Sequence, residues 1–137
     1  MLKLKFLGKF RDLGLLVMRI GLGLAFVFHG KDKMFHADPM VFWAQIGGAL
    51  APWGITFAPT FWGFMASFAE FGGGILFILG FLFRPAAAMM AFTMAVALSV
   101  HLGKGDGFAV YSHALEVGVV FLGLLFVGPG RFSLDSE

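Results

Sequence analysis

The chain has 137 residues, of which 59% are hydrophobic and 13% are charged, and its net charge is +2. Soluble domains carry about a quarter charged residues, so this composition excludes an ordinary soluble protein, and the small net charge gives no indication of nucleic-acid binding. The chain has no cysteine, which excludes disulfides, iron–sulfur clusters and thiolate zinc sites. The length predicts a single integral membrane domain over residues 1–137.

The first apolar stretch, residues 12–29, is long enough to cross a bilayer as a helix. It carries Arg19 about a third of the way along. A guanidinium stays protonated, and holding it in hydrocarbon costs from about 2.5 to well over 10 kcal/mol. We therefore expect an acidic partner on another span. The basic start resembles a signal peptide, but no small-residue cleavage site follows it, which favours a retained helix.

The connection over residues 31–60 is too long for a bare loop. Asp38–Pro39 is typical of a helix start, and Pro52 ends the apolar segment that follows. This segment is too short to span a membrane. We expect a short interfacial helix, anchored by Trp43 and Trp53 at the headgroups, with a lid over the bundle as the alternative.

A second span is predicted over residues 61–83, with Glu70 near its middle. Small residues flank Glu70 on one helix face, and phenylalanines occupy the opposite face. This pattern predicts that the Glu70 face packs closely against another helix and that the phenylalanines face lipid.

A third span is predicted over residues 86–102 and a fourth over residues 111–127. The third carries Met90, Met94 and His101 on one face. A stripe of methionine and histidine can bind Cu(I), but methionine at helical spacing is more typical of adaptable packing.

These elements predict an all-α membrane protein, a four-transmembrane-helix bundle with a short interfacial helix between the first two spans. Four spans place both termini on one side, and basic residues are more numerous there, which favours cytoplasmic termini. The terminal side carries Lys3, Lys5, Lys9, Arg11, Arg84 and Arg131, against Lys31, Lys33 and Lys104 on the other side.

Most of the ionisable residues within the spans are expected to gather toward the outer end. The predicted spans place Arg19 and Glu70 at a similar depth, which predicts a structural ion pair between them, with Glu116 above it. Imidazoles exchange protons near neutral pH, so the set predicts a polar, proton-handling pocket. Its candidate residues are Arg19, His29, Glu70, His101, His113 and Glu116.

Two chemistries fit such a pocket. A quinone needs hydrogen-bond donors for its carbonyl oxygens, a proton source and an apolar slot, which histidines, an arginine and many phenylalanines supply. A metal ion is the alternative, although the His-x-x-Glu spacing is common by chance. No motif indicates a tightly bound cofactor. The weak metal candidates are His29, His101, His113, Glu116 and Met94.

Several of these residues occur together in a known pattern. It comprises Arg19, His29-Gly30 and Lys33, then Glu70 before Gly72–Gly74 with Gly80 and Arg84, then His113 and Glu116, and the closing GPGRFSLD over Gly128–Asp135. Together they resemble the DoxX family of small four-helix bacterial inner-membrane proteins. The family's polar residues correspond here to Arg19, His29, Lys33, Glu70, Arg84, His113 and Glu116.

The resemblance implies a multi-pass protein of the bacterial cytoplasmic membrane with a link to redox chemistry. The family takes its name from a subunit associated with a terminal quinol oxidase, and related proteins act in thiosulfate:quinone oxidoreduction. Membrane lipid, a quinone and a redox-enzyme subunit are the implied partners. Three roles stay open at this point: a quinone-binding oxidoreductase subunit, a non-catalytic assembly subunit of a membrane complex, and a copper-handling protein.

Overall fold

The computed structural model describes residues 3–135, and within that range it is helical with no strand. Four helical segments of this part are long and apolar enough to cross a membrane. They are α1 (Arg11–Met34), preceded by the short 3₁₀ helix η1 (Lys5–Phe10), then α3 (Pro59–Leu79), α4 (Phe83–Gly103) and α5 (Phe108–Val127). Between α1 and α3 lie α2 (Pro39–Gly47) and the 3₁₀ helix η2 (Gly48–Trp53). The predicted four-span bundle with a short interfacial helix is confirmed.

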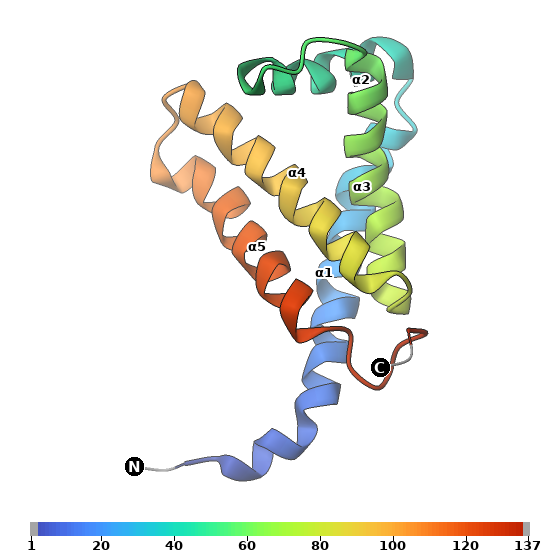
Figure 1. Cartoon of the computed structure of the whole chain (residues 1–137), viewed down its shortest axis with the longest axis vertical. Coiled ribbons are helices and arrows are strands. Elements are labelled where there is room, and N and C mark those ends of the chain that lie inside the picture. Colours follow the sequence, from blue (N-terminus) through green and yellow to red (C-terminus); the bar gives the residue numbers. More distant parts are fainter. Residues whose placement is uncertain (1–2, 136–137) are drawn as a thin grey trace.

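The long helices form two pairs, α1 with α3 and α4 with α5 (Figure 1). The pairs lie close together near the chain termini, which we call the terminal end, and diverge toward the other end, which we call the wide end (Figure 1). α2 and η2 lie across the wide end (Figure 1). No Cα atom of α1 lies within 8 Å of a Cα atom of α5. The four helices are therefore splayed on one side.

Glycines allow α1 and α3 to pack closely. A Cβ atom at Gly74 would lie 2.8 Å from the carbonyl oxygen of Gly23, and one at Gly30 would overlap the backbone at Phe71. Helix backbones approach this closely in membranes where small residues meet. The predicted close packing of the Glu70 face is confirmed, and residues of the opposite face, among them Phe61, Phe68 and Ile75, are exposed.

The segment formed by α2 and η2 is attached to three of the spans. A Cβ atom at Gly63 of α3 would overlap the backbone of Trp43, so α2 lies directly on α3. The Trp43 indole N–H donates to the carbonyl oxygen of Lys33 in α1 at 3.0 Å. The Trp53 indole N–H donates to Ser99 Oγ in α4 at 2.9 Å. Both indoles thus fasten the segment to the spans by hydrogen bonds, and the segment bridges the diverging pairs.

The hydrophobic core lies where the two pairs meet. Phe77 of α3 and Phe121 of α5 are fully buried and contact each other edge to face, with ring centroids 5.3 Å apart. Met90 and Met94 of α4 are buried in the same cluster. Their interpretation as packing residues is confirmed.

Helix boundaries differ from the predicted ones in two places that affect the site. α1 continues to Met34, past the predicted end at residue 29, because polar residues leaving the membrane do not by themselves end a helix. α3 ends at Leu79 instead of residue 83, because Gly80 adopts a left-handed conformation with φ of 63°. Glycine takes up this conformation at little cost, which is why it commonly ends helices.

Candidate functional site

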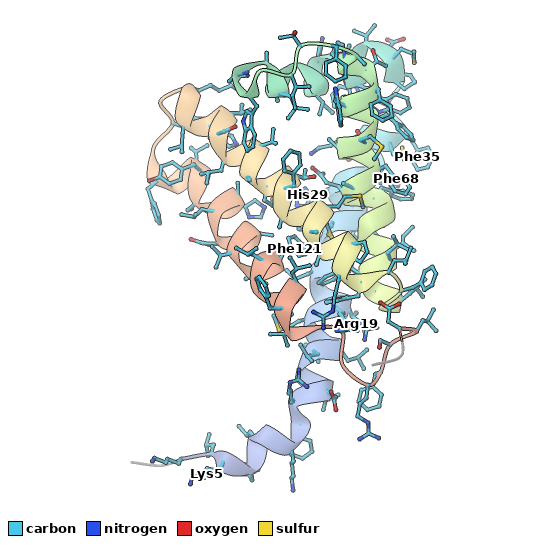
Figure 2. All side chains as sticks on the ribbon, viewed as in Figure 1. Lys5, Arg19, His29, Phe35, Phe68 and Phe121 are labelled. Atoms are coloured by element: carbon cyan, nitrogen blue, oxygen red, sulfur yellow. The ribbon has the colours of Figure 1, made fainter. Side chains whose placement is uncertain are left out.

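Arg19 is buried, as predicted, but no carboxylate of residues 3–135 forms an ion pair with it. Its guanidinium donates to the carbonyl oxygens of Phe77 at 3.1 Å and Ile78 at 2.7 Å. It also donates to the carbonyl oxygens of Pro129 at 3.1 Å and Phe132 at 2.5 Å. Carbonyls in the last turn of a helix lack intrahelical partners and carry the negative end of the helix dipole. Arg19 therefore joins the end of α3 to the C-terminal segment (residues 128–135), at the terminal end of the bundle (Figure 2).

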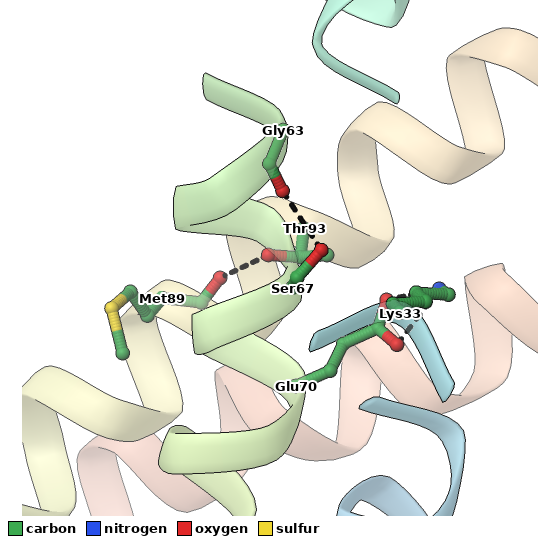
Figure 3. A network of polar contacts seen from close by, with 6 residues as sticks. All are labelled: Lys33, Gly63, Ser67, Glu70, Met89 and Thr93. Carbon is green, nitrogen blue, oxygen red and sulfur yellow. Dashed lines mark hydrogen bonds and ion pairs between the residues drawn. The ribbon is translucent and has the colours of Figure 1, made fainter. Parts of the chain in front are cut away.

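The predicted ion pair between Arg19 and Glu70 is wrong. Glu70 precedes Phe77 by seven residues in α3, which is about 10 Å along the helix. Its carboxylate instead accepts hydrogen bonds from Lys33 Nζ, at 2.7 and 2.8 Å (Figure 3). Because α1 extends to Met34, Lys33 lies on its last turn, beside Glu70.

The C-terminal segment has a structural function next to Arg19. The Asp135 carboxylate accepts hydrogen bonds from the backbone N–H groups of Leu82 at 3.0 Å and Phe83 at 2.8 Å, at the start of α4. Leu82 has a φ of 48°, a left-handed conformation that side-chain-bearing residues adopt at a cost. The GPGRFSLD motif thus stabilises the turn between α3 and α4.

A cavity of about 480 Å³ lies between α3 and α4, next to α2 and η2. Pockets that bind small molecules have volumes of roughly 300–1,000 Å³ and mostly apolar walls. Most of the side chains around this cavity are apolar, including Leu50, Met65, Met89, Phe92, Val96 and Val100. The cavity is the candidate functional site.

The Lys33–Glu70 ion pair contributes to the wall of the cavity. The Glu70 side chain is 6% exposed and that of Lys33 is 38% exposed, so the ammonium group is the more accessible partner. The hydroxyl groups of Ser67 and Thr93 donate to carbonyls of their own helices at 2.9 Å (Figure 3). Of these two residues, only Thr93 lines the cavity. Because its hydroxyl donates to the Met89 carbonyl, Thr93 Oγ1 can accept a hydrogen bond from a ligand.

His101 and Trp62 add two further polar groups to the cavity wall. His101 Nδ1 lies 2.7 Å from Asp106 Oδ2, near the wide end of α4. The indole nitrogen of Trp62 is buried and has no hydrogen-bond partner among residues 3–135. Leaving such a donor unsatisfied costs about 1–3 kcal/mol. The wall of the cavity therefore contains, in Trp62, a buried N–H group whose hydrogen-bonding capacity is unused within residues 3–135.

The structure separates the residues that the sequence grouped into one pocket. Glu70 and His101 line the cavity, whereas Arg19 lies at the opposite end. His29 and His113 face each other outside the cavity with ring centroids 6.2 Å apart, and Glu116 is exposed one turn farther along α5. Within the described range, no three His, Asp or Glu side chains are grouped so that they could hold a metal ion. Of the metal candidates, His29 and His113 are thus neighbours, whereas no third His, Asp or Glu of the described residues completes a group with them.

Two cavity residues, Lys33 and Trp62, were missed as candidates from the sequence. Lys33 was part of the family pattern, but the predicted end of the first span at residue 29 placed it outside the bundle. Trp62 is one of three tryptophans, and nothing in the local sequence distinguishes it from an interfacial anchor. Only the position of α3 beside α4 and η2 turns it toward the cavity.

The match to a family model covers residues 14–103, and that family is DoxX. The chain belongs to the DoxX family. It is 31% identical to the inner membrane protein YqjF of Escherichia coli K12 over 131 residues, covering 93% of each chain. It is 29% identical to the inner membrane protein YphA of the same organism over 139 residues, covering 95% of this chain and 94% of that one. No solved structure matches it. The DoxX chain is thus an integral inner-membrane protein with four apolar spans.

Proposed function

We propose that this DoxX protein binds a quinone, or a similar small aromatic molecule with carbonyl acceptors, in the cavity between α3 and α4. The observation that carries the proposal is an apolar space of about 480 Å³ whose wall includes Trp62, with a buried indole N–H that has no acceptor among residues 3–135. A flat apolar ring with carbonyl oxygens matches both properties. The proposed site is therefore the cavity, and Arg19, His29 and His113 lie outside it.

Individual wall residues suit each part of a quinone. Met65, Met89 and Phe92 provide the apolar and polarisable surface that aromatic rings favour. The Trp62 indole and the Lys33 ammonium group provide donors for carbonyl oxygens. Reduction of a quinone to a quinol takes up two electrons and two protons. In the proposed role the protein holds the quinone while a partner redox subunit supplies the two electrons. Glu70 and His101 supply the two protons to the quinone oxygens.

Access from the membrane supports a lipid-soluble ligand. Phe92 lines the cavity and is 51% exposed on the outer side of α4. Its position brings the cavity to the lipid-facing surface, where an isoprenoid tail would remain in the hydrocarbon.

The proposal is tested by titrating purified protein with a short-chain ubiquinone analogue and with menadione. Tryptophan fluorescence quenching and the shift in unfolding temperature report binding. We expect saturable binding by the wild type and at least about tenfold weaker binding by Ala97→Phe, because the new ring occupies the cavity. Ala95→Phe is the control on the exposed side of the same helix. Binding by the Trp62→Phe variant is measured from the ligand-induced shift in unfolding temperature. We expect it to be about fivefold weaker than that of the wild type, through loss of one hydrogen bond.

Absence of saturable binding by the wild type would overturn the proposal. If the Ala97→Phe and Ala95→Phe variants bound the ligand with equal affinity, the ligand would have to bind at a site other than the cavity. The unfolding temperature of each variant without ligand separates loss of binding from loss of fold.

The other two roles receive less support from the geometry. An assembly subunit would offer its small-residue face to a partner, but here that face is used inside the chain. Gly74 packs against Gly23, and a Cβ atom built on Gly73 would lie 3.5 Å from Met90 Cγ, in van der Waals contact. Copper handling would have to use methionine ligands, because no group of three His, Asp or Glu side chains that could hold a metal ion occurs among residues 3–135.

We also propose that both termini face the cytoplasm. Both lie at the terminal end of the bundle (Figure 1). Of the three basic residues assigned to the other side, Lys33 is paired with Glu70, which leaves Lys31 and Lys104. The excess of basic residues at the terminal end therefore supports this orientation under the positive-inside rule.

A further inference from the structure

One face of α5 is covered by no other helix of the described chain. α5 packs against α4, and its backbone stays away from those of α1 and α3. Only 17% of its most apolar stretch is buried, the lowest share among the four spans. A helix with so little contact inside its own chain offers most of its surface to lipid or to another protein.

This face carries ionisable side chains in the middle of the span. His113 and Glu116 are both exposed, and the ring of His29 from α1 lies beside that of His113. Glu116 makes no hydrogen bond or ion pair with any residue from 3 to 135. We call His29, His113 and Glu116 the α5 polar face.

The depth of Glu116 makes its exposure costly. It lies eight residues after Phe108, the first residue of α5, which is about 12 Å along the helix. Ionisable side chains at such depth almost always face a bundle interior or a water-filled cavity and pair with other groups. Within residues 3–135 of a single copy, Glu116 is exposed and pairs with no other group.

We infer that the α5 polar face is the contact surface of a homodimer. Two copies in the same membrane orientation are related by a two-fold axis along the membrane normal, which brings identical faces together at equal depth. His113 and Glu116 are one helical turn apart, so Glu116 of each copy is within reach of His113 of the other. Carboxylate and imidazole are complementary, and this complementarity favours a second copy of the chain as the occupant.

Gly123 supports a close approach of the two α5 helices. It lies two turns from Glu116 on the same side, and a Cβ atom built on it would meet nothing within 4 Å. At this position no other helix of residues 3–135 therefore lies close to α5. Small residues at such positions allow membrane helices to come together.

The inference is tested by cysteine cross-linking in native membranes, since the chain contains no cysteine of its own. Val119 lies one turn from both Glu116 and Gly123 and is 60% exposed, and Ile75 on α3 is 40% exposed. Under mild oxidation we expect the Val119→Cys variant to form a disulfide-linked dimer and the Ile75→Cys control to stay monomeric. Adding Glu116→Leu to Val119→Cys should lower the dimer yield at least about fivefold, because it removes two symmetry-related contacts and the loss of one hydrogen bond alone corresponds to about fivefold.

Three results would overturn the inference. Equal cross-linking at Val119 and Ile75 would indicate random collision. An unchanged dimer yield in the Glu116→Leu background would show that the polar face is not used. Absence of a homodimer, or a cross-link to a different protein, would assign this face to lipid or to another partner. The thermal unfolding of each variant confirms that it is folded.

Discussion

Arg19 illustrates how one charged residue can be held inside a membrane span by backbone carbonyl oxygens. The guanidinium has five N–H donors in a rigid planar arrangement, and four carbonyl oxygens from α3 and the C-terminal segment accept from them. Hydrogen bonds from a charged group contribute about 1.5–3 kcal/mol each. The residue therefore connects three parts of the chain that are distant in sequence.

Replacing Arg19 with glutamine is expected to destabilise the protein by about 3–5 kcal/mol, because the glutamine amide has only two N–H donors and leaves at least two of the four carbonyl oxygens without one, at about 1–3 kcal/mol each. Arg19→Lys should recover part of the loss, since an ammonium group keeps the charge but not the planar geometry. Thermal unfolding in detergent measures both effects. Arg11→Gln is the control, since Arg11 is exposed and makes one hydrogen bond, of 3.2 Å, to the Val127 carbonyl oxygen. Equal stability of the two glutamine variants would contradict this account of Arg19.

At the scale of elements, the ends of the helices determine where side chains meet. The turn between α3 and α4 contains Leu82 with a positive φ, and Asp135 accepts hydrogen bonds from the first N–H groups of α4. A carboxylate at a helix N-terminus satisfies free donors and interacts favourably with the helix dipole. The C-terminal segment thus fixes the relative position of the two spans that bound the cavity.

Removing the Asp135 carboxylate should therefore weaken this turn. We expect Asp135→Ala to lower the free energy of unfolding by about 1–2 kcal/mol. Asp38→Ala is the matched control, because Asp38 also precedes a helix but its side chain makes no capping hydrogen bond. Thermal unfolding of the two variants provides the comparison, and similar shifts in both would contradict a specific role for Asp135.

At the scale of the whole molecule, the two helix pairs meet at the terminal end and diverge at the wide end (Figure 1). The hydrophobic core holds the pairs together at the first end, and α2 with η2 bridges them at the second. The cavity lies in the space between the diverging pairs. The proposed orientation places this cavity nearer the periplasmic side of the membrane.

This orientation predicts which residues a membrane-impermeant thiol reagent will reach. Lys9 and Thr56 are exposed, at the terminal and wide ends respectively. In intact spheroplasts we expect the Thr56→Cys variant to be labelled and the Lys9→Cys variant to be labelled only after the membrane is permeabilised. The reverse pattern would place the termini in the periplasm.

The sequence predicted part of the candidate site as well as the fold. Glu70 and His101, two of the predicted pocket residues, line the cavity, and the small-residue face around Glu70 was assigned correctly to helix contact. The partner of Arg19 was predicted wrongly because it consists of backbone carbonyls, which every residue carries and no side-chain pattern reveals. Trp62 was missed because its missing hydrogen-bond partner is a property of the packed helices.

By itself, the sequence determined the four spans, the interfacial segment, the burial of Arg19 and the membership of the DoxX family. These follow from apolar length, helical periodicity and residue type, which are local properties. Only the tertiary structure decided that Lys33 pairs with Glu70 and that a cavity opens between α3 and α4. The physical reason is that the axial register of α1 against α3 is set by contacts such as Gly23 against Gly74, and such contacts join residues that are far apart along the chain.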